Sequence, residues 1–302
     1  MKTPARKPSS PPNRTARVRL LPQETPPAVP AAAAAPPPPP PIVSLTTDIG
    51  WAYAAQMKAV LLRAHPDLHI VDVTHEVGSH QILEGAFLLR YTCPWFPPRS
   101  IHLGIVDPGV GGKRNPLAIT CADGCTLLGP DNGLLSPLAE YLGDPRAFRL
   151  EPEKVARGSP VSSTFEGRDL FARAAGLLAG GTPASELGSP VDFMHLRIPA
   201  PSAISGGFSA MVLHVDHFGN LITNLPASDA REELGAPGET IAVTADGRTF
   251  RATVSRTYEE IPTGALGALE SSFGFVELSV SRGRARDLLG LRVNSRFEIR
   301  RR

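Results

Sequence analysis

Apolar and polar positions between residues 42 and 201 alternate between short β-branched runs and longer segments with helical spacing. The runs "IVSLTT", "HIVDVT" and "IHLGIV" predict strands, and "AYAAQMKAVLLRAH" and "ILEGAFLLRYTC" between them predict helices. Further strands are expected at "LAIT" and "TLLG", and further helices at "GLLSPLAEYLG" and "DLFARAAGLLAGG". Strands that alternate with helices at this spacing favour βαβ units. The pattern therefore predicts an α/β sandwich domain over residues 42–201 with a mainly parallel sheet.

The pattern changes after "PAPSAISGG", which is typical of a linker. Beyond it the apolar runs are mostly strand-like, and a helix is indicated only at "ARDLLG". The predicted strands are "AMVLHV", "TIAVTA", "RTFRATV", "FGFVELSV" and "RFEIR". Several short strands in about 100 residues predict a second, all-β barrel domain over residues 202–302.

Residues 1–41 differ from the rest, because they contain the runs "AAAAA" and "PPPPPP" and few large apolar side chains. Such a segment cannot bury enough surface to offset its ordering entropy, so a disordered tail is predicted. It carries six basic residues and one acidic residue. Without them, the 31 basic and 29 acidic residues of the chain become 25 and 28, a net charge of −3. The body therefore gives no electrostatic argument for nucleic acid, and no apolar stretch is long enough to span a membrane.

Candidate chemistry gathers where predicted strands end, which is where ligands bind in open α/β sheets. "TTDIG" places Asp48 after the first strand, and "VDPGVGGKR" places Asp107 and Arg114 after the third. "STFEGRD" places Glu166 just before a predicted helix, where an acid also suits the helix dipole. "GVGGKR" lacks the Gly-x4-Gly-Lys-Ser/Thr spacing of a phosphate loop, and the chain has no Gly-x-Ser-x-Gly nucleophile elbow.

Three cysteines, at 93, 121 and 125, are too few for a disulfide framework and fit a reducing, cytoplasmic setting. "CADGC" has the spacing of half a zinc site, but no second pair of Cys or His follows it. A strand-turn-strand with two buried thiols is expected there instead. The eight histidines show no ligand spacing with Asp, so no metal is predicted.

The stretch "HVDHFGNLITNL" places Asp216, Phe218 and Asn220 around a glycine turn. An aromatic ring can stack on a nucleobase and an Asn amide can bond its Watson–Crick edge. A polar turn over a core Phe explains the same spacing, and the spacing alone favours that structural explanation.

Taken together, these stretches resemble the S-adenosylmethionine hydroxide adenosyltransferases, which are related to the fluorinase and chlorinase. The resemblance runs from Leu45 to about Val280, essentially the whole chain after the tail. It is carried, in order, by "LTTDIG", "QMKAVLL", "IVDVTHEV", "EGAFLL", "IHLGIVDPGVGG", "GPDNGLL", "STFEGRDLFA", "HVDHFGNLITN" and "SSFGFVELSV".

The resemblance implies an N-terminal α/β domain, a C-terminal β-barrel and a homotrimer with active sites between subunits. It also implies that water attacks C5′ of the ribose of S-adenosylmethionine, which releases adenosine and methionine. The sulfonium is already a good leaving group, so neither a general acid nor a cofactor is expected. The enzyme must hold one water in line with the C5′–S bond, and such positioning contributes up to about 7–11 kcal/mol.

In this family an Asp, an Arg and a His surround the water, and the first two fall on Asp107 and Arg114. Retention of Asp107 indicates the water-using branch, because the halogenases lose that acid. The third position carries Glu166 in place of the His. Either Glu166 orients or deprotonates the water, with Arg114 offsetting its charge, or the activity is lost or altered.

The remaining matches concern the substrate. Asp48 matches the residue that binds the ribose hydroxyls, and Asp216 matches a contact to the methionine portion. Phe218 and Asn220 match the adenine side, and Ser272 with Phe273 matches the lining of the ligand pocket. Besides Glu166, two positions depart from the family, because Trp51 or its neighbour and Gln81 stand where acids are expected. His80, beside Gln81, is either a replacement imidazole or a surface histidine. An altered methionine end leaves open a different adenosyl substrate, or ligand binding without turnover.

Overall fold

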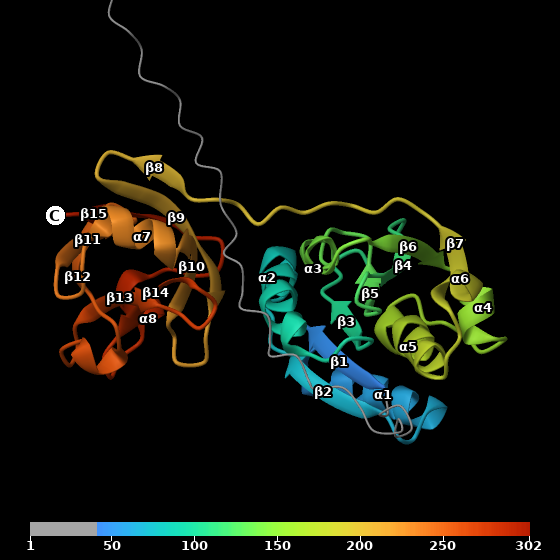
Figure 1. Ribbon diagram of the computed structural model, residues 1–302. Coiled ribbons are helices and arrows are strands. Elements are labelled where there is room, and N and C mark those ends of the chain that lie inside the picture. Colours follow the sequence, from blue (N-terminus) through green and yellow to red (C-terminus); the bar gives the residue numbers. More distant parts are fainter. Residues whose placement is uncertain (1–40) are drawn as a thin grey trace, which may run out of the picture.

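The computed structural model describes residues 41–302, so the tail predicted over residues 1–41 lies outside the described residues except for its last proline. Two sheets organise the described chain, an α/β layer structure and a β-barrel, joined by an extended segment (Figure 1). The predicted combination of an α/β fold with a C-terminal barrel is confirmed.

The N-terminal sheet has seven strands in the order β2-β1-β3-β5-β4-β6-β7. Its first four strands run parallel to one another, and the three remaining pairings are antiparallel, so the sheet is mixed. Antiparallel pairing of β4 with β5 follows from the short "CADGC" connection, which cannot make the crossover that parallel strands need. The strands are β1 (Ile42–Thr47), β2 (His69–Thr74), β3 (Ile101–Ile105), β4 (Pro116–Thr120), β5 (Thr126–Pro130), β6 (Arg146–Leu150) and β7 (Gly188–Pro190).

Helices cover both faces of this sheet (Figure 1). On one face α1 (Gly50–Ala64) packs with α5 (Ala172–Ala179) over a core that includes Met57, Leu61 and Phe171. On the other face α2 (Ile82–Thr92) packs with α3 (Ser136–Leu142) around Phe87. Full burial of a side chain such as Phe87 contributes about 1.5–3 kcal/mol. The short helices α4 (Pro152–Ala156) and α6 (Ala184–Leu187) and the turns η1 (Cys93–Trp95) and η2 (Gly167–Phe171) complete this part.

The second sheet closes into a seven-stranded barrel because β10 pairs with both β14 and β9, and β8 extends one side. The five predicted strands are confirmed; β8, β10, β13 and α7 were not predicted as elements. The barrel elements are β8 (Ser202–Ile204), β9 (Gly207–Val215), β10 (Leu221–Pro226), α7 (Ala227–Leu234), β11 (Thr240–Ala245), β12 (Arg248–Val254), η3 (Tyr258–Glu260), β13 (Leu266–Glu270), β14 (Phe275–Val280), α8 (Ala285–Leu289) and β15 (Arg296–Arg301).

Helix α2 carries the contact between the two parts of the chain. The ring of Phe87 lies edge-on to Phe273 and to Phe275, with centroids 5.3 and 5.8 Å apart. The buried carboxylate of Glu84 in α2 accepts a hydrogen bond from the backbone N–H of Gly78 at 2.9 Å and lies 2.7 Å from Nδ1 of His214 in β9. Apolar packing and a buried polar pair therefore join the α/β part to the barrel.

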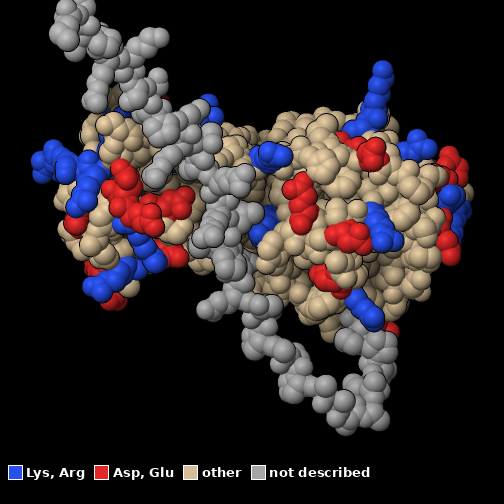
Figure 2. Space-filling model, turned by 45° about the horizontal axis from the view of Figure 1, so that its top comes forward, with Lys and Arg blue, Asp and Glu red and all other residues tan. Residues whose placement is uncertain are grey.

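Acidic and basic side chains are interspersed on the face of the molecule shown in Figure 2. That face has no broad surface of one sign of the kind that nucleic-acid binding requires. Among residues 41–302, every helix is too short or too polar to cross a bilayer.

Candidate active site

Asp48 and Asp107 lie at the carboxyl ends of two neighbouring strands of the N-terminal sheet. Their strands β1 and β3 are parallel neighbours, with Thr47 paired to Ile105. The backbone N–H of Asp48 continues this pairing by donating to the carbonyl of Ile105 at 3.3 Å. The sequence prediction that these acids lie at carboxyl ends of strands is therefore confirmed.

Arg114 joins Asp107 and Glu166 into one cluster. Its Nε donates to both carboxylate oxygens of Asp107 at 3.1 Å, and its Nη2 donates to Oδ2 of Asp107 and to Oε2 of Glu166. The side chains of Asp107, Arg114 and Glu166 are 7, 11 and 16% exposed. The three residues predicted to act on water thus lie together in a partly closed site.

The cluster has two carboxylates for one guanidinium. Burial alone would lower the pKa of Arg114, but the hydrogen bonds from Asp107 and Glu166 outweigh it and hold that pKa above its ordinary value. The guanidinium carbon also lies 6.0 Å from the ring centre of the buried Phe171. Arg114 is therefore a permanent cation that separates two acids.

Two polar atoms of the cluster remain available. Oε1 of Glu166 and Nη1 of Arg114 make no hydrogen bond with any residue in the described range, whereas Arg114 engages both oxygens of Asp107. A carboxylate oxygen accepts hydrogen bonds and a guanidinium N–H donates them. The pair can therefore hold a water between an acceptor and a donor, with Glu166 as the side that receives a proton.

Backbone packing brings the loops of Arg114 and Glu166 together. Gly111 has φ +72°, and a Cβ there would lie 2.3 Å from the carbonyl oxygen of Ser163, so only glycine permits this approach. Glu166 itself precedes a π-helical turn, Gly167–Phe171, that leads into α5. Such turns are uncommon and frequently lie at functional sites.

Two supporting residues were missed by the sequence analysis. Asn132 donates from Nδ2 to the carbonyl of Val106 at 2.9 Å, which fixes the segment just before Asp107. Asp169 accepts from the backbone N–H of Ser162 at 3.0 Å and thereby fixes the loop that carries Glu166. Both lie in stretches already singled out, "GPDNGLL" and "STFEGRD", so the motifs indicated the region without indicating these roles.

His80 touches Asp48 through its backbone and not through its ring. Its N–H donates to Oδ2 of Asp48 at 2.9 Å, and its φ is +65°, while the side chain is exposed. The imidazole makes no hydrogen bond to the Asp107–Arg114–Glu166 cluster. The interpretation of His80 as a surface histidine is therefore confirmed.

Trp51 and Gln81, the two positions where the family carries acids, contact other residues of this chain. Trp51 is exposed and donates from Nε1 to Glu76 at 3.2 Å. Oε1 of Gln81 accepts from Nδ2 of Asn294 in the barrel at 2.6 Å. Both positions thus carry structural contacts within the chain.

In the barrel, the β9–β10 turn holds Asp216 and Asn220 tightly together. Asp216 accepts from the backbone N–H of Asn220 at 2.8 Å and from its Nδ2 at 2.9 Å, and Oδ1 of Asn220 accepts from Oγ of Ser279 at 2.7 Å. Asn220 is buried, whereas Phe218 at the tip is 73% exposed. The turn is therefore ordered by its polar residues and presents an aromatic ring to solvent.

Asp216 and Phe273 line a cleft of about 610 Å³ that faces the edge strand β2 of the same chain. Ser272 is exposed beside Phe273. In the described chain, no hydrogen bond or ion pair joins these barrel residues to the Asp107–Arg114–Glu166 cluster. The predicted site residues therefore form two separate groups within one chain.

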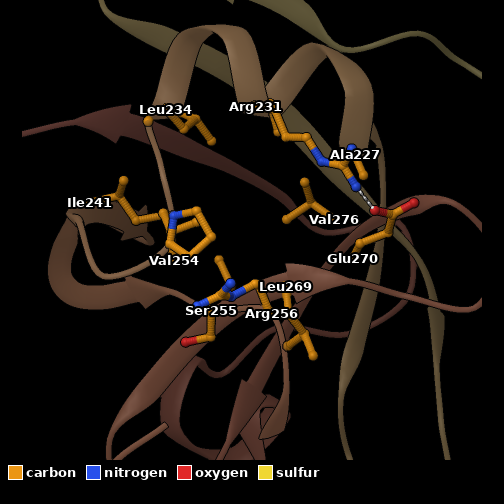
Figure 3. Close-up of a pocket in the computed structure, with 14 residues that line it drawn as sticks. Ala227, Arg231, Leu234, Ile241, Val254, Ser255, Arg256, Leu269, Glu270 and Val276 are labelled. Atoms are coloured by element: carbon orange, nitrogen blue, oxygen red, sulfur yellow. Dashed lines mark hydrogen bonds and ion pairs between the residues drawn. The ribbon is translucent and has the colours of Figure 1, made fainter. Parts of the chain in front are cut away.

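A further cavity of about 290 Å³ lies in the barrel beneath α7. Apolar side chains line it, and an ion pair between Arg231 and Glu270 closes one side (Figure 3). None of the predicted site residues takes part in it.

The thiols do not form a reactive site. Cys121 and Cys125 are buried at the two ends of the β4–β5 connection, as expected, and burial raises the pKa of each to about 12. Within residues 41–302, no group of three His, Cys, Asp or Glu side chains is arranged to hold a metal ion.

The fold and the cluster together define a two-part α/β and β-barrel protein with an acid–arginine site at the carboxyl ends of parallel strands. Residues 43–188 match the SAM hydroxide adenosyltransferase N-terminal domain, and residues 210–298 match the corresponding C-terminal domain. The chain belongs to the SAM hydroxide adenosyltransferase family.

Named relatives agree with this membership. An (R)-S-adenosyl-L-methionine hydrolase from Salinispora tropica is 37% identical over 265 residues, which cover 85% of this chain and 97% of the relative. A fluorinase from an Actinoplanes species is 31% identical over 217 residues, which cover 62% of this chain and 72% of the relative. An uncharacterized conserved protein from Thermotoga maritima has a crystal structure that superposes with a TM-score of 0.79 at 30% identity, covering 86% of this chain and all of that one.

Proposed function

We propose that this chain is an S-adenosyl-L-methionine hydrolase that forms adenosine and L-methionine. The cluster of Asp107, Arg114 and Glu166 carries the proposal, because it leaves one acceptor and one donor free to hold a water. Relatives of this family are named for the (R) form of the substrate, so that sulfonium stereoisomer is the one proposed here.

In the reaction, the water oxygen attacks C5′ of the ribose while the C5′–S bond breaks. The electron pair of that bond passes to sulfur, which turns the sulfonium into the neutral thioether of methionine. The proton of the water passes to the free oxygen of Glu166 and then to solvent. Arg114 keeps both carboxylates in place and steadies the forming hydroxide. The leaving group needs no activation, so no metal or cofactor is proposed.

Asp48 is proposed to bind the ribose hydroxyls, and the barrel residues Asp216, Phe218, Asn220, Ser272 and Phe273 are proposed to bind the methionine and adenine ends. The cleft that Asp216 and Phe273 line contains none of Asp107, Arg114 and Glu166, which supports a homotrimer in which the barrel of one subunit completes the site of the next. Sedimentation velocity that gives a monomer at assay concentration would contradict this assembly. Three free thiols support a reducing, cytoplasmic location.

The direct test is incubation of the purified full-length chain with each sulfonium stereoisomer of S-adenosylmethionine in ¹⁸O-labelled water. We expect equal amounts of adenosine and methionine from the (R) form, with one ¹⁸O in the 5′-hydroxyl of adenosine. Product formation no faster than without protein would refute the proposal. Tight binding in calorimetry with no product would favour a non-catalytic ligand-binding protein, for which Glu166 in place of the family's His is the supporting observation. A requirement for chloride or fluoride would favour halide as the nucleophile.

His80 offers a prediction about the ribose subsite. His80→Gly is expected to change kcat and KM by no more than about twofold, because glycine adopts the same positive φ and keeps the N–H on Asp48. His80→Val is expected to raise KM, since a β-branched residue disfavours that backbone conformation. A large loss of kcat in His80→Gly would show instead that the imidazole takes part in the reaction.

A further inference from the structure

A second large cleft lies between the two parts of the chain, away from the proposed active site. It has a volume of about 840 Å³ and lies among α2, α3, the connecting segment 196–200 and strands β10 and β14 of the barrel. In Figure 1 helix α2 faces the barrel with α3 beside it, and the connecting segment runs past both helices. None of the residues proposed for the hydrolase reaction lines this cleft.

Arg90 of α2 lines the cleft and is a buried cation without an acidic partner. It is 5% exposed, and its guanidinium makes no hydrogen bond or ion pair with any residue from 41 to 302. Its Nη1 is fully enclosed and unpaired. Burial lowers the pKa of Arg90 from its ordinary value, but a guanidinium keeps its proton in proteins, so the charge stays.

The surroundings compensate this charge only in part. The guanidinium carbon lies 3.5 Å from the ring centre of Tyr141 and 4.8 Å from that of Tyr91. Ring faces attract a cation, but they do not satisfy its five N–H donors. Glu140 also lines the cleft, but its carboxylate contacts His195 at 2.7 Å and not Arg90. The remaining charged residue of the cleft, Arg197, is positive.

The contrast with Arg114 indicates what is missing. Arg114 is less deeply buried, with a side chain 11% exposed, and yet is matched by two carboxylates. Removing a charge from water is expensive unless a counter-charge with good hydrogen-bond geometry replaces the solvent. An unmatched guanidinium beside a cavity is the arrangement expected of an anion site.

We propose that this cleft binds a small organic anion with an aromatic ring. Its carboxylate or phosphate group pairs with Arg90, and its ring packs against Phe275, Leu196 and Ile198, which also line the cleft. A volume of this order is typical of small-molecule sites. Because both parts of the chain and their connection contribute walls, the bound anion stabilises their packing. The proposal does not depend on the hydrolase activity.

Calorimetry with three probes that share one ring tests the site on the full-length protein. Benzoate carries a carboxylate, phenyl phosphate carries a phosphate, and benzyl alcohol is neutral. We expect at least one anion to bind with a dissociation constant below about 1 mM, and benzyl alcohol to bind at least tenfold more weakly. The preferred anion then identifies the head group. No binding of either anion, or equal binding of benzyl alcohol, would overturn the proposal.

Substitution of Arg90 tests whether the anion binds in this cleft. Arg90→Met keeps much of the apolar stem and is expected to weaken anion binding more than tenfold. Arg248→Met is the matched control, because Arg248 also lies over an aromatic ring, that of Phe250 at 5.1 Å, but is exposed in the barrel. This control is expected to bind as the wild type does. Anion binding that survives in Arg90→Met belongs to another site and would refute the assignment.

Thermal unfolding separates an anion site from a purely structural arginine. Without ligand, Arg90→Met is expected to melt at the same temperature as the wild type or higher, since the uncompensated charge is gone. With ligand, the anion is expected to raise the melting temperature of the wild type but not that of Arg90→Met. A lower melting temperature together with no anion effect in the wild type would assign Arg90 to packing on the tyrosines. If Arg90→Met does not fold, Arg90→Lys decides, because it keeps the charge without the planar fork and should weaken anion binding. Unchanged affinity in Arg90→Lys would contradict the proposal.

Discussion

Asp107→Asn is expected to lower kcat for hydrolysis of S-adenosylmethionine by roughly 10²-fold or more. The amide has the shape of the carboxylate but not its charge, so it cannot hold Nε and Nη2 of Arg114 through two anionic oxygens. Arg114 is then held by Glu166 alone, so the N–H donor on its Nη1, which is proposed to contact the water, moves out of position. KM is expected to change little, because the proposed substrate contacts of Asp48 and the barrel are untouched.

The same substitution is expected to have a small effect on stability. Arg114 keeps Glu166 as a counter-charge, so no buried cation is left without a partner. Asp144→Asn is the matched control, since Asp144 pairs with Arg146 at the surface, 67% exposed, and should leave both kcat and the melting temperature unchanged. Retention of more than a tenth of wild-type kcat in Asp107→Asn would show that Asp107 is not needed to arrange the water.

The strands and helices nearest the proposed active site could be predicted from sequence because their apolar periodicity is strong. "IVSLTT", "IHLGIV" and "ILEGAFLLRYTC" have the expected structure, and their order is enough to place Asp48 and Asp107 at one sheet edge. Elements with weak or mixed patterns were missed. β10 overlaps the second half of "HVDHFGNLITNL", which was interpreted as a polar turn. β13, "LGALE", is short and contains a glycine, so its pattern is not distinctive.

Contacts between distant segments were beyond the reach of sequence patterns. The Arg114 pairing with Glu166 spans 52 positions, and the Glu84 contact with His214 spans 130. The resemblance to a known family indicated the first of these contacts, since it placed both residues around one water. The resemblance assigned no role to Glu84 or Arg90, which are charged residues in the first and last turns of the apolar helix α2. Their roles depend on which element packs against α2, and that is a property of the tertiary fold.

The role of Glu166 is decided by comparing two substitutions. Glu166→Gln keeps an oxygen that can accept from Arg114 but removes the proton acceptor, so kcat is expected to fall by about 10²–10⁴-fold. Glu166→His supplies the imidazole that the resemblance leads one to expect at this position, and it is expected to keep kcat within about tenfold of the wild type. Each rate is measured as adenosine formed under saturating substrate, with Glu153→Gln, an exposed acid of α4, as the matched control.

The three rates distinguish the mechanisms because the two variants change charge in the same way. Both replace an anion by a side chain that can be neutral, so both weaken the ion pair with Arg114. If holding Arg114 were the whole contribution of Glu166, Gln and His would lower kcat together. If proton transfer is the contribution, only Gln lowers it, because an imidazole accepts a proton and an amide does not. A wild-type rate at background with activity restored by Glu166→His would mean that the carboxylate has turned a hydrolase into a binding protein.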